Sequence, residues 1–277
     1  MRKIGGHVSI AGGIINAVTK TQEIGGNCLQ IFAGSPRVWA RSLISPDQVK
    51  KFRHQIEQLD FEPVFIHALY LVNLCSDNPD LVQKSVTSLL FDLRNGDQLH
   101  AAGVIVHIGS HQGRGFNSVK VELVKSIQSL LDQSKNTPFI IENSAGQKGK
   151  VGSLQELAYL CEQLNHPRIK VCLDTAHLFE AGWDLRLSSE TDRLVTELQN
   201  LNLLDKLACI HLNDSQTPLG SGRDNHANLG DGEVGTAGLK YFVNHSAFNS
   251  LPLLLEVPGG DKQGPDKINI DIAKSMI

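Results

Sequence analysis

Residues 81–109, LVQKSVTSLLFDLRNGDQLHAAGVIVHIG, decide the fold class. Their first part, Leu81–Ala101, places apolar side chains at helical spacing. Ala102-Gly103 can end that helix just ahead of the next element. The run Gly103–Gly109 is then almost wholly apolar and rich in Val and Ile, without alternation, which is typical of a strand buried on both faces of a parallel sheet. The stretch therefore predicts one helix-to-strand step of an α/β fold.

The same step recurs along the whole chain. Eight short apolar runs are expected to form strands: Ile4–Ile10, Cys28–Ala33, Pro63–Ala68, Gly103–Gly109, Pro138–Asn143, Ile169–Thr175, Leu207–Asn213 and Leu251–Val257. Helical spacing lies between them in Ser45–Leu59, Val119–Leu131 and Leu154–Leu164, and two helices have Pro46 and Pro79 near their expected starts. Eight strand–helix units in 277 residues predict a single (β/α)₈ TIM-barrel domain over residues 1–277. An open, doubly wound parallel sheet is the alternative fold.

Composition limits the classes of function. The chain is 41% hydrophobic and 20% charged, so it can bury a large core. No apolar stretch approaches the ~20 residues that cross a bilayer, and the N-terminus lacks the apolar stretch of a signal peptide, so we expect neither a membrane protein nor a secreted one. Five cysteines without a C-x-x-C pair argue against a disulfide framework or a cysteine-rich zinc finger. The formal net charge of −3 provides no basic field that would indicate a nucleic-acid partner.

The ends of the predicted strands carry side chains that bind metals. Strands three to eight end in His67, His107, Glu142, Asp174, His211 and Glu256, while His177 follows Asp174 and the loop after strand seven adds Asp224 and His226. Because the C-terminal ends of barrel strands meet at one mouth, we expect these nine side chains to converge there. Such a cluster is costly unless it is paired or metal-bound. Imidazole and carboxylate without thiolate suit Zn²⁺, Mn²⁺ or Fe²⁺, and nine ligands suit two or three ions with a bridging carboxylate.

The remaining histidines and one glycine motif have simpler explanations. We expect solvated side chains at His54, His100, His166 and His245, whereas His7 and His111 follow strands and are candidate hydrogen-bond partners of the ligands. Residues 230–235 match G-x-G-x-x-G, but they follow a polar loop rather than a strand, which argues against dinucleotide binding. The motif is expected to shape a loop beside Asp224 and His226. The long segments Thr217–Gly238 and Pro258–Pro265 indicate function at the same rim.

The motifs around these residues resemble the endonuclease IV family of apurinic/apyrimidinic (AP) endonucleases. The similar stretches are Val171–His177, Ala181–Asp184, His211–Ser215, Gly220-Ser221 and Arg223–Gly232, together with Gly5–Ser9 and Gly12-Gly13 near the start. The resemblance spans essentially the whole chain. It departs at Asn225, where a basic residue is common, and at Ala176, where cysteine is common. Neither position is a ligand, so the departures bear on DNA contacts and not on the chemistry.

This resemblance implies a zinc-dependent DNA repair enzyme, with three Zn²⁺ ions per chain and Mn²⁺ as an alternative ion at one site. It implies cleavage of duplex DNA 5′ to an abasic site, which leaves a 3′-hydroxyl and a 5′-deoxyribose phosphate, and removal of 3′-blocking groups. The first ion is assigned to His67, His107 and Glu142, the second to Glu142, Asp174, His211 and Glu256, and the third to His177, Asp224 and His226. Glu142 is the implied catalytic residue, which bridges two ions and orients the attacking hydroxide. Arg37, Tyr70 and Leu71 are implied to enter the DNA at the abasic gap.

The resemblance further implies a monomer that acts in the cytoplasm or at the nucleoid, with no membrane partner. Other functions remain open. A sugar isomerase or epimerase on the same barrel would need fewer metal ligands, and a non-catalytic lesion-binding protein would be expected to lack one. A phosphotriesterase-like hydrolase is disfavoured because the first predicted strand has no His-x-His. Metal content per chain, measured together with cleavage of an abasic duplex, would separate these functions.

Overall fold

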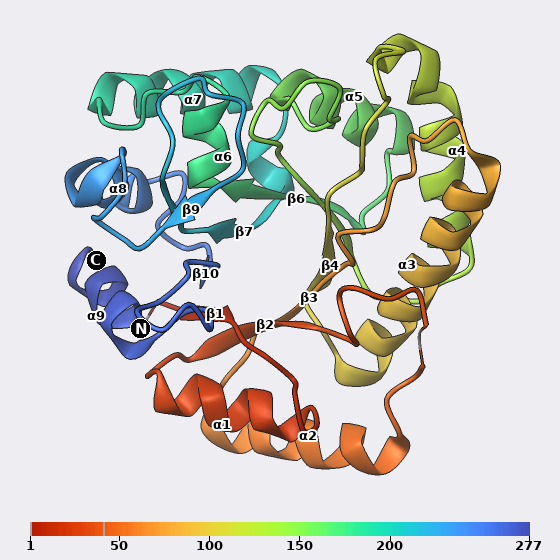
Figure 1. The fold of residues 1–277 in the computed structure, drawn as a ribbon, viewed down its shortest axis with the longest axis horizontal. Coiled ribbons are helices and arrows are strands. Elements are labelled where there is room, and N and C mark those ends of the chain that lie inside the picture. The colour runs from red at the N-terminus through yellow and green to blue at the C-terminus, as the bar shows by residue number, and fades with distance from the viewer. Residues whose placement is uncertain (1, 41) are drawn as a thin grey trace.

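The computed structural model describes residues 2–40 and 42–277, and its centre is a closed barrel of eight parallel strands (Figure 1). The barrel strands are β1 (Ile4–His7), β2 (Cys28–Phe32), β3 (Val64–His67), β4 (Gly103–Val106), β5 (Phe139–Glu142), β6 (Ile169–Asp174), β7 (Leu207–His211) and β10 (Leu253–Leu255). The barrel closes where β1 pairs with β10, with Gly5 opposite Leu254. Each strand lies within one of the eight predicted runs. The TIM-barrel prediction is therefore confirmed, and the open sheet is excluded.

Helices surround the barrel and connect successive strands (Figure 1). They are α1 (Ile15–Glu23), α2 (Pro46–Leu59), α3 (Pro79–Leu99), α4 (Phe116–Asp132), α5 (Leu154–Leu164), α6 (Thr175–Glu180), α7 (Ser188–Asn200), α8 (Gly235–Asn244) and α9 (Lys267–Ser275), with a 3₁₀ turn, η1, at Leu204–Lys206. In the described ranges, no helix combines the length and apolarity needed to span a membrane. The starts of α2 and α3 are as predicted. Ser45 and Asn78 cap them by accepting bonds from backbone N–H groups, and a proline follows each cap.

Two sequence-based boundaries were wrong. The helix α3 ends at Leu99 with His100 in the left-handed conformation, ahead of the predicted stop at Ala102-Gly103. The reason is tertiary: the Ala102 N–H already donates to Val64 O of the neighbouring strand β3 (2.8 Å). The helix α8 begins at Gly235, so the long loop expected over Thr217–Gly238 is shorter.

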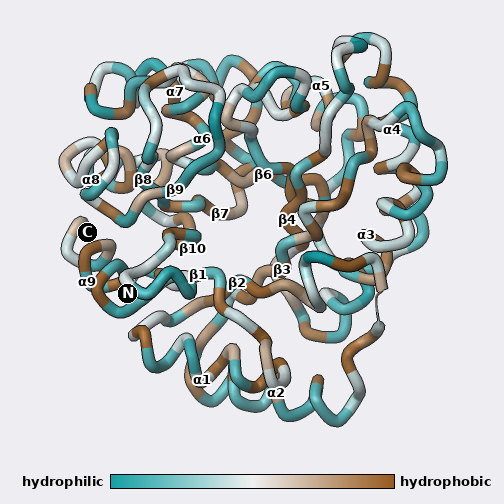
Figure 2. The backbone as a smooth tube through the Cα atoms, in the orientation of Figure 1, coloured by the Kyte–Doolittle hydropathy of each residue, from teal (hydrophilic) through white to brown (hydrophobic). Residues whose placement is uncertain are grey.

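The barrel interior is packed below its mouth. The buried side chains of this layer are Cys28, Phe65, Ile105, Ile140, Cys172, Cys209 and Leu254. A second, larger apolar layer lies between the strands and the outer helices, and Figure 2 shows hydrophobic residues along strands such as β4. At Gly5 a Cβ atom would stand 1.7 Å from the Cys28 carbonyl oxygen, so β1 can approach β2 only with glycine there. Because this interior is filled, a site on the barrel axis must lie at the rim.

A small antiparallel hairpin stands on that rim. It pairs β8 (Asp214–Ser215) with β9 (His226–Ala227), directly after barrel strand β7. The ten residues between its strands, 216–225, include Asp224. The hairpin (β9 in Figure 1) brings Asp224 and His226 to the barrel mouth, where Asp224 Oδ1 lies 3.1 Å from His177 Nε2 and His226 Nε2 lies 3.5 Å from Asp174 Oδ2. Neither residue belongs to a barrel strand.

Candidate metal centre

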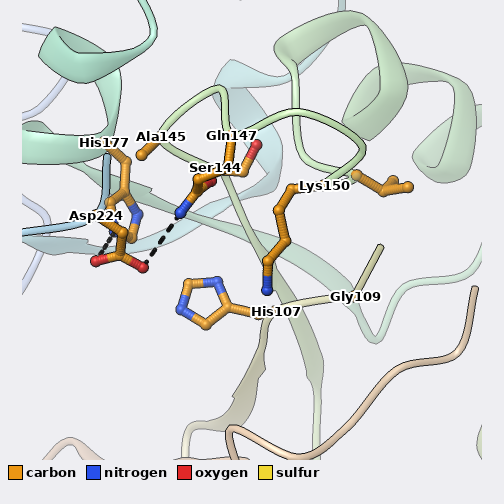
Figure 3. A pocket seen from close by; sticks show the side chains of 9 residues that line it. His107, Gly109, Ser144, Ala145, Gln147, Lys150, His177 and Asp224 are labelled. Carbon is orange, nitrogen blue, oxygen red and sulfur yellow. Dashed lines mark hydrogen bonds and ion pairs between the residues drawn. The ribbon is translucent and has the colours of Figure 1, made fainter. Parts of the chain in front are cut away.

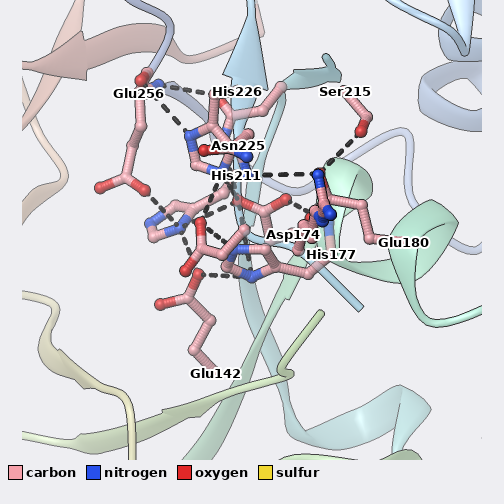
Figure 4. Close-up of polar contacts among 12 residues, drawn as sticks. Glu142, Asp174, His177, Glu180, His211, Ser215, Asn225, His226 and Glu256 are labelled. Carbon is pink, nitrogen blue, oxygen red and sulfur yellow. Dashed lines mark hydrogen bonds and ion pairs between the residues drawn. The ribbon is translucent and has the colours of Figure 1, made fainter. Parts of the chain in front are cut away.

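All nine predicted ligands lie together at the barrel mouth. Three groups of side chains each offer one ligand atom per residue within 4.8 Å of the others, namely His67, His107 and Glu142; Glu142, Asp174, His211 and Glu256; and Asp174, His177 and His226. Asp224, the ninth residue, adjoins the last group with its Oδ1 3.1 Å from His177 Nε2. The groups share Glu142 and Asp174, so they form one continuous cluster, and Figure 4 shows its members Glu142, Asp174, His177, His211, His226 and Glu256.

Glu142 at the end of β5 joins the first two groups. Its Oε2 lies 3.3 Å from His67 Nε2 and 3.4 Å from His107 Nε2, while its Oε1 lies 2.9 Å from His211 Nδ1. The side chain is completely buried. Burial raises the pKa of the Glu142 carboxyl, but His107 and His211 outweigh it and hold that pKa well below its ordinary value. The two oxygens thus face different sets of imidazoles, as a carboxylate shared by two cations requires.

His211 is surrounded by carboxylates. Its Nδ1 lies 3.4 Å from Glu256 Oε2 and 3.8 Å from Asp174 Oδ2, in addition to Glu142. Burial lowers the pKa of His211, but the charges of Glu256 and Glu142 outweigh it and raise this pKa to about 10. The excess of negative charge therefore favours a positive charge at this point, which either a proton or a metal ion can supply.

The third group is more open. His226 Nε2 lies 3.5 Å from Asp174 Oδ2 and 3.7 Å from Asp224 Oδ1. Asp224 is 43% exposed, and Gln147 Nε2 donates to its Oδ2 at 3.5 Å (Figure 3). His177 Nε2 and His226 Nε2 are buried, and both face carboxylates: Asp224 Oδ1 lies 3.1 Å from His177 Nε2, and Asp174 Oδ2 lies 3.5 Å from His226 Nε2. Buried imidazoles and carboxylates are costly unless they are paired or held by metal ions.

In four of the histidines, one ring nitrogen lies within hydrogen-bond distance of a carbonyl or amide oxygen. His67 Nδ1 lies 2.8 Å from Ala68 O, His177 Nδ1 3.0 Å from Asn143 O, His226 Nδ1 3.4 Å from Glu256 O, and His211 Nε2 2.8 Å from Gln30 Oε1. The opposite nitrogen in each ring faces carboxylates of the cluster. A metal-bound histidine typically donates its other N–H to a carbonyl or similar acceptor, which orients the ring. The residues present therefore fit divalent metal ions.

A cavity of about 890 Å³ opens above the cluster. His107, His177 and Glu256 line it together with Arg37 and Tyr70. Tyr70 is 65% exposed, and its ring packs edge-on against Phe32 at 5.2 Å between centroids. Leu71 beside it is 37% exposed, so neither residue of the pair is buried under α3. The predicted DNA-contacting side chains thus lie on the same rim as the metal ligands.

Comparisons with known proteins agree with this geometry. A family model described as a xylose isomerase-like TIM barrel matches residues 18–275. "Probable endonuclease 4" of Haloquadratum walsbyi is 39% identical over 262 residues, which cover 94% of each chain, and that of Chloroflexus aggregans is 34% identical over 281 residues, which cover 100% of this chain and 98% of the relative. The crystal structure of endonuclease IV from Thermus thermophilus superposes with a TM-score of 0.87 at 33% identity, covering 99% and 98% of the two chains.

The chain belongs to the endonuclease IV family. The prediction of a nuclease-class enzyme is confirmed by these relatives. A 3-keto-D-glucoside 4-epimerase from E. coli has a similar barrel, with a TM-score of 0.69 at 13% identity. At that identity the similarity shows a common fold alone and does not favour the epimerase alternative.

In this endonuclease IV family member, Gln30 is a functional residue that sequence reasoning missed. Its Nε2 donates to Glu256 Oε1 at 2.6 Å, and its Oε1 lies 2.8 Å from His211 Nε2, so it positions two ligands of the second group. His7 Nδ1 also lies 2.9 Å from Glu256 Oε1, in agreement with its suggested role. His111 does not reach the ligands, because its Nδ1 accepts the N–H of Gly115 instead. One signal could have revealed Gln30: it is a single polar residue within an apolar strand.

The glycine motif wraps around a buried carboxylate. The N–H groups of Gly230, Gly232, Val234 and Gly235 donate to Asp214 at distances of 2.9 to 3.4 Å. A Cβ atom at Gly232 would stand 2.5 Å from Asp214 Oδ1, so the loop can close around the carboxylate only with glycine there. The expected loop-shaping role is confirmed, and it braces the hairpin that carries His226.

The other histidines lie away from the metal centre. His54 and His100 are exposed, as predicted. The prediction was wrong for His166 and His245, which are half-buried and accept backbone N–H groups of Arg168 and Ala247.

Proposed function

We propose that this chain is a zinc-dependent AP endonuclease of base excision repair. It hydrolyses the phosphodiester bond 5′ to an abasic site in duplex DNA and leaves a 3′-hydroxyl and a 5′-deoxyribose phosphate. It also removes 3′-blocking groups. The enzyme acts as a monomer with one domain over residues 1–277. Its substrate places it with the chromosome, in the cytoplasm or at the nucleoid.

The observation that carries this proposal is the continuous cluster of nine ligands in three overlapping groups. Membership of the endonuclease IV family supports a DNA substrate. The donor set of five imidazoles and four carboxylates suits zinc, with Mn²⁺ as an alternative ion at one site. One ion would be held by His67, His107 and Glu142, and a second by Glu142, Asp174, His211 and Glu256. The third would be held by His177, Asp224 and His226, with Asp174 close enough to contribute.

Zinc held at these residues would supply the Lewis acidity that phosphodiester hydrolysis requires. Glu142 is the proposed catalytic residue, because its buried carboxylate lies at the centre of the cluster and can orient the attacking water. Gln30 keeps the ring of His211 and the carboxylate of Glu256 in place by hydrogen bonds to both. These residues would thus hold the metal ligands in fixed positions around the attacking water and the phosphate.

Recognition of the abasic site is assigned to the rim. Arg37 is exposed at the edge of the cavity and can contact backbone phosphates. Tyr70 and Leu71 protrude beside the centre and can fill the gap left by the missing base in a kinked duplex. The abasic nucleotide would then turn into the cavity above the ligands.

The test combines two measurements on one preparation. Elemental analysis of protein purified without added metal should give about three zinc ions per chain. The same protein should cleave a duplex with a single abasic site on its 5′ side, and a chelator should abolish cleavage until zinc is restored. A reproducible content of one ion or fewer would contradict the three-ion centre. One or two ions together with epimerisation of a sugar and no cleavage would favour the epimerase alternative.

A further inference from the structure

Glu180, the last residue of α6, is a buried acid for which the proposed reaction has no use. Only 1% of its surface is exposed. Its Oε1 accepts hydrogen bonds from Ser215 Oγ (2.7 Å), Thr217 Oγ1 (3.1 Å) and the backbone N–H of Asn225 (3.3 Å) (Figure 4). Its Oε2 is buried and makes no hydrogen bond within the described part of the chain. One carboxylate oxygen thus accepts three hydrogen bonds, and all three donors belong to the β8–β9 hairpin.

The backbone at the end of α6 holds the same hairpin. The carbonyl of Glu180 accepts the N–H of Gly222 at 3.0 Å, and the carbonyl of Phe179 accepts the N–H of Gly220 at 3.1 Å. The loop over residues 216–225 has no helix or strand of its own. Its conformation is held by these bonds from α6 together with bonds inside the hairpin, such as Gln216 N–H to Asn225 O at 2.9 Å and Thr217 Oγ1 to Ser221 Oγ at 2.7 Å.

This loop carries ligands of the third group. Asp224 immediately precedes Asn225, whose N–H is held by Glu180, and His226 immediately follows it. The opposing ligand, His177, lies three residues before Glu180 in the same helix. The helix α6 therefore carries one ligand, His177, and also holds the segment that carries two others, Asp224 and His226. The contact of 3.1 Å between His177 Nε2 and Asp224 Oδ1 spans these two segments.

The backbone of the first two groups needs no comparable anchor, although Gln30 orients the side chains of His211 and Glu256. Their ligands stand at the ends of barrel strands, where the parallel ladder fixes the backbone; Glu142, for example, is paired with Cys172 of the next strand. Asp224 is not in a strand, and 43% of its side chain is exposed. Its other polar neighbour beyond the cluster is Gln147 at 3.5 Å, which is a long hydrogen bond.

We propose that Glu180 is a positioning residue for the third metal site, which orders the 216–225 loop so that Asp224 and His226 meet His177. This inference rests on the proposed function only for the presence of ions at the centre. Residues that orient metal ligands typically contribute about 10–100-fold in metal affinity or activity. The loss of zinc affinity is expected at the third site, because Glu180 holds the loop that carries Asp224 and His226. Its hydrogen bonds do not reach the ligands of the first two groups.

The experiment measures zinc affinity of the whole chain, without DNA, by competition with a chelating dye across a series of free zinc concentrations. Glu180→Ala should weaken the most weakly bound ion about 10–100-fold and leave the tighter ions unchanged. Glu180→Gln keeps an oxygen that can accept the three donors, so it should restore most of that affinity. Glu190→Ala is the matched control, because Glu190 is an acid at the start of α7 that pairs with Arg193 and does not contact the loop.

A second variant covers the case in which Glu180→Ala does not fold. Thr217→Val removes one of the three donors to Glu180 and keeps the carboxylate, so it should weaken the most weakly bound ion by less than Glu180→Ala. Wild-type zinc affinity in Glu180→Ala, or in Thr217→Val where Glu180→Ala does not fold, would refute the positioning role and leave the nuclease proposal intact. A wild-type protein that binds fewer than three ions would refute the three-ion centre itself.

Discussion

Tyr70 offers the sharpest test of how this barrel holds DNA. We expect Tyr70→Ala to weaken binding to a duplex with an abasic site by roughly ten- to a hundredfold, since stacking of one aromatic ring on a base is worth about 1–3 kcal/mol. Binding to intact duplex, which has no gap for the ring, should change much less. Fluorescence anisotropy with a non-cleavable abasic analogue, alongside an intact duplex of the same sequence, measures both affinities.

The cost in stability follows from the exposure of the ring. Tyr70 keeps 65% of its surface exposed, so folding buries about a third of a side chain that can bury roughly 200 Å². At about 25 cal/mol per Å², this area corresponds to less than about 2 kcal/mol. A fully buried aromatic residue would contribute about 3–5 kcal/mol when cut to alanine. The melting temperature should therefore fall by only a few degrees.

The matched control is Tyr241→Ala. Tyr241 is 41% exposed on the outer helix α8, where its hydroxyl donates to Asp192. This variant should show a similar small loss of stability without a change in either DNA affinity. Equal losses on abasic and intact duplex for Tyr70→Ala, or less than a twofold loss on the abasic duplex, would refute the insertion of this ring at the gap.

Three further changes have defined outcomes. Glu142→Gln should keep the circular dichroism spectrum but reduce turnover more than tenfold, because the side chain keeps its shape and loses its charge; turnover within tenfold of wild type would contradict its central role. Asp214→Asn should lower the free energy of unfolding in urea by about 1–3 kcal/mol, because it leaves buried N–H groups without an acceptor. Burial opposes ionisation of Asp97, but hydrogen bonds from Asn136 and Thr137 outweigh it and lower its pKa. Because the pKa of Asp97 is lower in the folded than in the unfolded protein, the ionised side chain stabilises the fold fully above the ordinary carboxyl pKa. That stabilisation is lost as the pH falls through the folded pKa. Asp97→Asn should therefore lower the free energy of unfolding at pH 7 and have almost no effect on it in strong acid.

The strands and their ligands could be predicted because both follow from local sequence. Val104-Ile105-Val106 can hardly be anything but a buried strand, and the residue after it, His107, stands at the mouth of any parallel barrel. No knowledge of side-chain packing is needed for that step. The same reasoning placed Glu142 and Asp174, whose positions depend on strand order and not on individual contacts.

The supporting residues could not be predicted, because their partners lie far away in the chain. Gln30 and His211 are 181 residues apart, and nothing in either local sequence indicates their hydrogen bond. His111 shows the converse error: it lies beyond the end of a strand and was a candidate partner like His7, but its Nδ1 accepts the backbone N–H of Gly115, four residues on. The sharing of Asp174 between two ligand groups also depends on three-dimensional distances.

The metal ligands are therefore held in place in two ways, and the difference predicts where amino-acid substitutions will be tolerated. The backbone of ligands at strand ends, such as His67, is fixed by the parallel ladder, so many apolar substitutions in the same strand should leave these ligands in place. The hairpin that carries Asp224 and His226 is held by hydrogen bonds to the side chains of Asp214 and Glu180, which few substitutions preserve. Substitutions in the 216–225 loop should thus affect metal binding well before they affect the stability of the barrel, whereas substitutions in the packed layer beneath the mouth should do the reverse.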